Sequence, residues 1–160
     1  MKKSLLLAIL TLGFSWILTS CSSDDDNNNS NNDAIIEEVE NIAESGDWII
    51  TSFIDSGEDE TSDFTGYTFT FGSNGTLTAT NGTTTHTGIW TITDSSNSTD
   101  DDNNSDDDLD FNIFFNVPDT NDFEDLNDDW DIDTYSSTTI KLIDVSGGNG
   151  GTDTLTFQKI

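Results

Sequence analysis

From Trp48 to the C-terminus, apolar and polar residues alternate with a period of two along one short segment after another. Threonine, isoleucine and aromatic residues dominate these segments, and all of them favour strands. Turn signals such as Ser73-Asn74-Gly75 and Asn81-Gly82 separate several of the segments. The pattern predicts eight strands, at residues 47–54, 66–72, 75–80, 84–93, 109–117, 129–136, 138–145 and 152–159.

Eight consecutive strands joined mostly by short turns favour an up-and-down antiparallel sheet, and closing that sheet into a barrel removes its exposed edges. We therefore expect an all-β fold, an eight-stranded up-and-down antiparallel barrel in one domain at 33–160. The apolar residues of each strand should point inward. They either line a cavity for a ligand or fill the barrel as a packed core, and the second interpretation is favoured. The main candidates are Phe69, Trp90, Phe111, Phe115 and Trp130.

A single helical pattern precedes the strands, at residues 33–43, with Asp33 as its expected N-cap. Its apolar side chains fall on one face of the helix. Residues 119–128 are expected to contain a short helical turn around Phe123. The stretch 94–108, DSSNSTDDDNNSDDD, is predicted to be a flexible acidic loop because of its composition.

The chain begins with Met1-Lys2-Lys3 and an apolar run from Ser4 to Leu18. The run is shorter than the roughly 20 residues that a membrane-spanning helix needs. A positive start, a short apolar run and small residues before a cleavage point are typical of a secretory signal peptide. We expect residues 1–20 to be removed. The alternative is an uncleaved anchor, and the small Thr19-Ser20 pair argues against it.

Cys21 is the only cysteine and follows the apolar run directly. Leu18-Thr19-Ser20-Cys21 resembles the bacterial lipobox, which implies that Cys21 becomes the first residue and carries acyl chains such as palmitate. Residues 21–32 contain no apolar residue after Cys21 and are predicted to be a disordered acidic tether. Their start, Ser22 to Asp26, resembles the export signal of surface lipoproteins in the Bacteroidota. This resemblance implies an outer-membrane protein exposed at the cell surface, and the alternative is the periplasmic face.

The charge of the chain excludes some partners. It has 32 acidic and 4 basic residues, a net charge of −28, and no arginine. Nucleic-acid binding is excluded because it needs Lys or Arg to displace counterions from phosphates. The stretch 94–110 suits weak, non-specific binding of Ca²⁺. A dedicated site is not expected, because Ser105 and Phe111 stand where an EF-hand loop needs Gly and Glu.

Nothing in the sequence predicts catalysis or a cofactor. His86 is the only histidine, and no partner for general-base chemistry can be assigned to it. The chain lacks the G-x-S-x-G, H-E-x-x-H and phosphate-loop motifs. Its carboxylates are so numerous that no pair stands out as a glycosidase pair. We therefore expect that the protein is not an enzyme.

Gly46-Asp47-Trp48 opens the first predicted strand after the predicted helix. This placement resembles the G-x-W motif of the lipocalins, in which Trp48 would close one end of the barrel. The segment 66–90 also resembles lipocalin-like domains of Bacteroidota lipoproteins, and the likeness covers residues 46–160. The chain departs from the lipocalin pattern because it has no arginine for the motif tryptophan, so that Lys159 could supply only a weaker cation–π contact.

The lipocalin resemblance implies a membrane-anchored barrel that binds a small apolar or amphipathic ligand. Two other functions remain open. The first is a module that binds glycans or surface proteins, in which exposed tryptophans would stack on sugars. The second is a ligand-free structural protein of the cell envelope.

Overall fold

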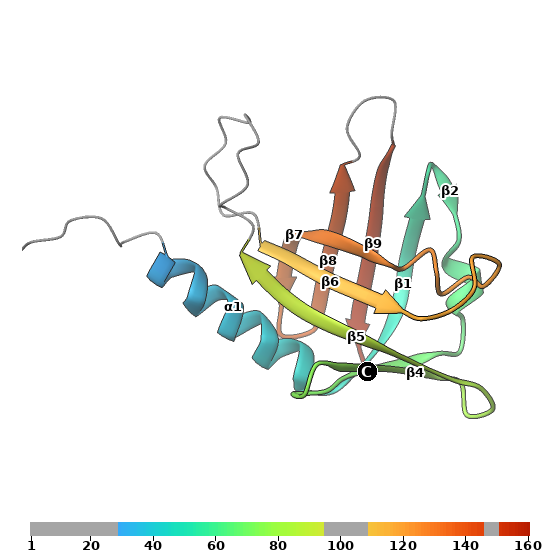
Figure 1. Ribbon diagram of the computed structural model, residues 1–160, viewed down its shortest axis with the longest axis horizontal. Helices are drawn as coiled ribbons and strands as arrows, with labels where there is room; N and C mark the ends of the chain where they lie inside the picture. The colour runs from blue at the N-terminus through green and yellow to red at the C-terminus, as the bar shows by residue number, and fades with distance from the viewer. Residues whose placement is uncertain (1–28, 95–108, 146–150) are drawn as a thin grey trace, which may run out of the picture.

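The computed structural model describes residues 29–94, 109–145 and 151–160 (Figure 1). The leader, Cys21 and the acidic loop beyond Asp94 lie outside the described residues. The elements in chain order are α1 (Asn29–Glu44), β1 (Asp47–Asp55), β2 (Glu58–Asp59), the 3₁₀ helix η1 (Thr61–Phe64), β3 (Thr68–Phe71), β4 (Thr76–Thr80), β5 (Thr85–Asp94), β6 (Leu109–Phe115), β7 (Asp128–Ser136), β8 (Thr139–Val145) and β9 (Thr152–Lys159).

The strands form a closed barrel. From β3 to β9, every strand pairs antiparallel with the next one in the chain, and β1 pairs with both β3 and β9. The ladder between β1 and β9 closes the sheet over a register from Trp48–Lys159 to Ile54–Thr154. The predicted fold class is thereby confirmed, an eight-stranded up-and-down antiparallel barrel preceded by a short helix. The two-residue strand β2 extends from β1 as an additional hairpin.

Besides the additional strand β2, the structure corrects the sequence prediction at three places. Helix α1 begins at Asn29, within the predicted tether, rather than at Asp33. Asn32 is buried and its side-chain amide donates to Asp94 Oδ2 at 3.1 Å, which holds the first turn against the end of β5. The 3₁₀ helix η1 was not predicted. The expected helical turn around Phe123 is instead part of a series of turns, among them a bond from Glu124 N–H to the Asn121 carbonyl.

Alternation along the strands puts the apolar side chains inside. On β6 every second residue from Leu109 to Phe115 is buried, and the residues between them reach solvent. The buried core contains aromatic side chains from β1, β3, β5, β6, β7 and β9, on all sides of the barrel. Burial of large aromatic side chains supplies most of the hydrophobic stabilisation of a core of this kind. The chain has a single cysteine and cannot form an internal disulfide, so the stability of the domain depends on this core.

Each tryptophan of the barrel fixes a connecting segment to the core. The indole N–H of Trp48 donates to the Ala43 carbonyl at 2.8 Å, at the end of α1. The Trp90 N–H donates to the Gly72 carbonyl at 3.0 Å, and the Trp130 N–H donates to the Leu126 carbonyl at 3.1 Å. A buried N–H without a partner would be costly, so these bonds fix both the indole rings and the turns that they contact.

Gly88 is required by its position on β5. An added Cβ would lie 2.9 Å from Cδ1 of Phe115 and would also collide with the Phe114 carbonyl oxygen. We expect Gly88→Ala to lower the free energy of unfolding by about 1–3 kcal/mol, because overpacking forces the β5–β6 ladder apart. Urea denaturation followed by tryptophan fluorescence measures the effect. The control is Gly151→Ala, whose Cβ would approach no atom closer than 3.6 Å and should change little. Equal midpoints for the two variants would contradict the expectation.

Candidate functional site

The predicted ligand-lining residues fill the middle of the barrel. Phe69, Trp90, Phe111, Phe115 and Trp130 are all at most 3% exposed. The Trp90 and Phe111 rings stack with centroids 5.5 Å apart. Phe71 joins them edge-on, with its centroid 5.3 Å from Trp90 and 5.4 Å from Phe111. These separations are those of rings in direct contact, so the residues form a packed core.

Helix α1 and the G-x-W motif close one end of the barrel. Trp48 is fully buried there, and Val39 and Ala43 of α1 are buried in the same core. The ammonium group of Lys159 lies 6.0 Å from the centre of the Trp48 indole and donates to Ser45 Oγ at 2.7 Å. Lys159 thus makes with Trp48 the cation–π contact that was expected of it in the absence of an arginine. Gly46 leaves room for this side chain, since a Cβ would lie 2.6 Å from Lys159 Cε.

A second aromatic cluster closes the opposite end, and sequence reasoning missed it. Phe123, from the segment between β6 and β7, is 2% exposed. Its ring lies 5.3 Å from Phe64 of η1, 5.1 Å from Phe115 and 4.9 Å from Tyr67. Residues from the β2–β3 connection, the β6–β7 connection and the end of β6 meet here, so only the folded chain reveals the cluster. Both ends of the barrel are therefore closed by side chains.

His86 belongs to this cluster. Its ring stacks on Phe123 at 4.1 Å with an interplanar angle of 21°. A ring stacked in this way serves packing, and within the described part of the chain His86 forms no hydrogen bond to a carboxylate. Among the residues that the structure describes, no group of three or more His, Cys, Asp or Glu side chains could hold a metal ion.

No helix in the described ranges is long and apolar enough to cross a membrane.

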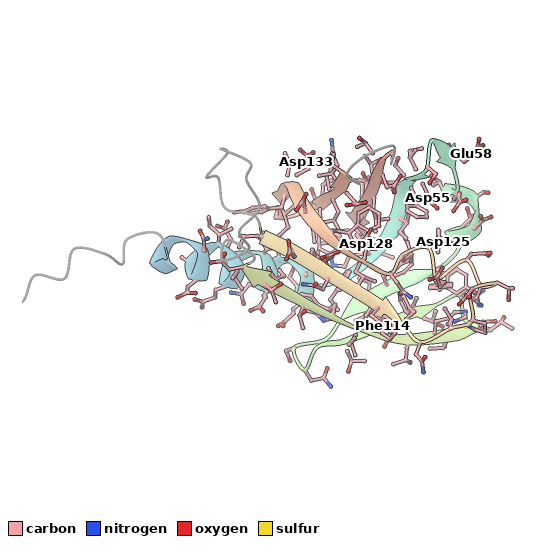
Figure 2. All side chains as sticks on the ribbon, turned by 45° about the horizontal axis from the view of Figure 1, so that its top comes forward. Asp55, Glu58, Phe114, Asp125, Asp128 and Asp133 are labelled. Atoms are coloured by element: carbon pink, nitrogen blue, oxygen red, sulfur yellow. The ribbon has the colours of Figure 1, made fainter. Side chains whose placement is uncertain are left out.

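Carboxylates crowd the rim beside the Phe64–Phe123 cluster. Burial and the nearby Asp125, Asp55, Asp63 and Asp122 raise the pKa of Glu60. Burial also raises the pKa of Asp125, with further contributions from Asp55 and Glu124. The two lysines of the described residues do not offset these charges, because Lys141 is exposed on β8 and Lys159 lies at the other end of the barrel. Figure 2 shows Asp55, Asp125 and Asp128 on this side of the molecule.

Among the described residues, Asp128, the first residue of β7, has the largest shift in pKa. Burial, a hydrogen bond with Asp129 and the charge of Asp144 raise its pKa from 3.8 to about 6. The folded state thus binds this proton more tightly than the unfolded state does. The resulting stabilisation is complete below pH 3.8, the unfolded value, and is lost as the pH rises through about 6.

We therefore expect the free energy of unfolding to rise as the pH falls from 7 to 5, and Asp128→Asn to be more stable than the wild type at pH 7. Solvent screening at this partly exposed carboxyl keeps the gain at pH 7 to about 1 kcal/mol or less. Urea denaturation at pH 5, 6 and 7 tests both points, with the exposed Asp133→Asn of the same strand as control. A pH dependence that is identical in Asp128→Asn and wild type would contradict the assignment.

A groove of about 660 Å³ lies outside the barrel, between α1 and the β7–β8 hairpin. Glu37, Glu38 and Tyr135 line it, together with Lys159. The Tyr135 hydroxyl donates to Glu38 Oε2 at 3.4 Å, and burial raises the tyrosine pKa. The Tyr135–Glu38 hydrogen bond joins α1 to β7 across this groove, and Lys159 is already held by Ser45 and Trp48.

The outer surface of β3–β6 is uncharged over most of its area. We call this surface the threonine face. It is made of outward-pointing side chains that carry hydroxyl, amide or apolar groups. Its border towards β7 is acidic, since Asp110 lies on β6 itself and Asp129, Asp131 and Asp133 occupy β7. The face consists of Thr68, Thr70, Thr76, Thr78, Thr80, Thr85, Thr87, Ile89, Thr91, Asn112 and Phe114.

Two large apolar side chains are exposed at its centre. Ile89 is 58% exposed and Phe114 is 50% exposed, and the two are direct cross-strand partners on β5 and β6. The three tryptophans of the described residues, in contrast, are at most 3% exposed. The expectation that tryptophans stack on sugars is therefore wrong for Trp48, Trp90 and Trp130, because their rings are needed in the core. Phe114 is the exposed aromatic ring of this face.

Comparison of the chain with models of known protein families, with characterised proteins and with solved structures finds no match.

Proposed function

We propose that this protein is a lipid-anchored binding module that faces outward from the bacterial outer membrane and has no enzymatic activity. The leader pattern, the position of Cys21 and the acidic run after it support the anchor and its address. Helix α1 begins at Asn29, so that the barrel follows the expected lipid attachment point after a short stretch of chain. More than one acyl chain is needed for stable anchoring, and a lipoprotein cysteine supplies that number.

The packed interior is the observation that carries the proposed mode of binding. Rings from β3, β5, β6 and β9 contact one another across the barrel. The ring of Phe71, for example, contacts those of Trp90, Phe111 and Phe157, with centroid separations of 5.3, 5.4 and 5.4 Å. An eight-stranded barrel is just wide enough for side chains to fill or for one small ligand. Here side chains take that space, and we propose that partners bind to the outer surface instead of entering the barrel.

The test is a titration of the mature protein with a fluorescent fatty acid and with a porphyrin, which would report on an internal apolar site. We expect no saturable binding and no quenching of the buried tryptophans. The matched control is the double variant Ile89→Thr/Phe114→Thr, which removes the exposed apolar pair and hence any adsorption to it. Saturable uptake of one probe per chain that persists in the double variant would overturn the proposed mode of binding.

Exposure at the cell surface is tested separately. Treatment of intact cells with a protease should degrade the barrel when it faces outward, while a soluble periplasmic marker remains intact. Protection of the barrel until the outer membrane is permeabilised would place the protein on the periplasmic side and contradict the outward orientation.

A further inference from the structure

We infer that the threonine face binds an uncharged polysaccharide, with Phe114 and Ile89 at the centre of the contact; this inference rests on the proposed function as an outward-facing binding module. Polysaccharide here means a linear sugar polymer without phosphate, sulfate or carboxylate groups. Three features of the face favour such a partner: the register of its strands, the hydrogen-bonding capacity of its side chains and the distribution of charge around it.

The register aligns the outward side chains in rows across the strands. The central row is Thr76 on β4, Ile89 on β5 and Phe114 on β6, which are successive cross-strand partners. The next row on one side joins Thr70, Thr78 and Thr87, and the row on the other side joins Thr91 and Asn112. Neighbouring strands are about 4.8 Å apart, and rows on one face are two residues, or about 6.7 Å, apart. The apolar pair Ile89 and Phe114 is thus flanked on both sides by rows of side chains that carry hydroxyl or amide groups.

This arrangement matches the surface of a sugar ring. Hydroxyl and amide side chains both donate and accept hydrogen bonds, as sugar hydroxyls do. None of the hydrogen bonds within the described residues uses the hydroxyls of Thr76, Thr78 or Thr87, so these groups are available to a partner. The C–H face of a pyranose is apolar and packs on an exposed aromatic ring, which Phe114 provides at 50% exposure.

Solubility alone does not explain the face. The adjacent strand β7 meets solvent with Asp129, Asp131 and Asp133, and the chain has 32 acidic residues. In Figure 2 the five labelled acidic residues lie above Phe114 in the view. The carboxylates nearest the face, Asp110 on β6 and Asp47 on β1, lie at its borders, and the strand positions around Ile89 and Phe114 carry threonine and asparagine. In so acidic a protein, an uncharged area that exposes an isoleucine and a phenylalanine side by side is expected where an uncharged partner binds.

The charge distribution also selects against other partners. Polyanions and anionic membranes are repelled by a chain of net charge −28. A polycation would bind more strongly to the carboxylates of β7 or of the rim around Glu60 than to threonines. Two apolar side chains are also too few to insert a sheet into a lipid surface.

The experiment uses the mature lipidated protein in detergent micelles and measures its co-sedimentation with cellulose, β-1,3-glucan and starch as uncharged probes, and with alginate-coated beads as the anionic probe. We expect at least one uncharged polysaccharide to bind and the anionic probe not to bind. Phe114→Thr and Thr78→Asp should each weaken that binding about tenfold, by loss of the stacking surface and by a charge among the hydroxyls. Val145→Thr, which changes an exposed apolar residue of β8 to threonine, should leave binding unchanged.

Three results would overturn the inference. They are the absence of binding to every uncharged probe, binding that survives Phe114→Thr and Thr78→Asp, and a dimer detected by sedimentation velocity that Phe114→Thr dissociates, which would make a second copy the occupant of the face. Thermal unfolding of each variant confirms that it is folded. None of these results bears on lipid attachment or on the filled interior, which are measured by mass and by probe titration, so failure of this inference is distinguishable from failure of the proposed function.

Discussion

Trp48→Ala is expected to lower the free energy of unfolding by about 3–5 kcal/mol, the range for removal of a large aromatic side chain from a core. Trp48 is fully buried, and its indole N–H donates a hydrogen bond to the Ala43 carbonyl at 2.8 Å. The substitution leaves a cavity at the closed end of the barrel and frees the end of α1 at the same time. Domains of this size have a total stability of about 5–15 kcal/mol, so the variant should be marginal.

Urea denaturation followed by circular dichroism measures this loss. Trp48→Phe is the matched variant, since it keeps most of the apolar volume and removes only the N–H donor, and should cost about 1–2 kcal/mol. The phenylalanine variant keeps the prediction testable if the alanine variant does not fold. A midpoint for Trp48→Ala equal to that of the wild type would show that the indole does not hold α1 and the barrel together.

Cys21→Ser is expected to abolish acylation of the protein completely. Cys21 is the only thiol in the chain, and a serine hydroxyl does not replace a thiol in a thioether bond to lipid. Cells grown with labelled palmitate should incorporate label into the wild-type protein and none into the variant. Ser22→Ala serves as the control because it alters the adjacent residue and leaves the thiol in place. Label that remains on Cys21→Ser would place the lipid elsewhere or show that the precursor is not a lipoprotein.

The strands could be predicted from the sequence because their alternation is local. Phe111, Ile113 and Phe115 are buried and Asn112 and Phe114 are not, as a period of two requires. Strand β2 could not be predicted, since two residues show no period. The turn that forms it has positive φ at both Ser56 and Gly57, at 49° and 86°, which suits a tight hairpin.

The closure of the barrel ends was predicted at one end only. Gly46 and Trp48 are close in sequence and form a motif, so the α1 end could be expected. At the opposite end Phe64, Phe123 and His86 come from segments with no sequence relation to one another, and the stacking of His86 on Phe123 depends on the fold. The choice between cavity and core likewise needed the ring contacts, since alternation assigns a face and not a volume.

The threonine face illustrates the same limit. The sequence contains its threonines as ordinary strand residues, and their β-branched side chains would be expected on any exposed sheet. Only the register places Ile89 beside Phe114 and aligns Thr70, Thr78 and Thr87 in one row. Cross-strand neighbours, rather than sequence neighbours, therefore define this candidate site.

We propose that Cys21, as the first residue of the mature protein, attaches a filled barrel to the membrane. Mass spectrometry of the N-terminal peptide of the protein purified from membranes tests this most directly. We predict a peptide that begins at residue 21, with a mass increased by a diacylglycerol group and one further acyl chain. A peptide that begins at Met1 and carries an unmodified thiol at position 21 would contradict the account.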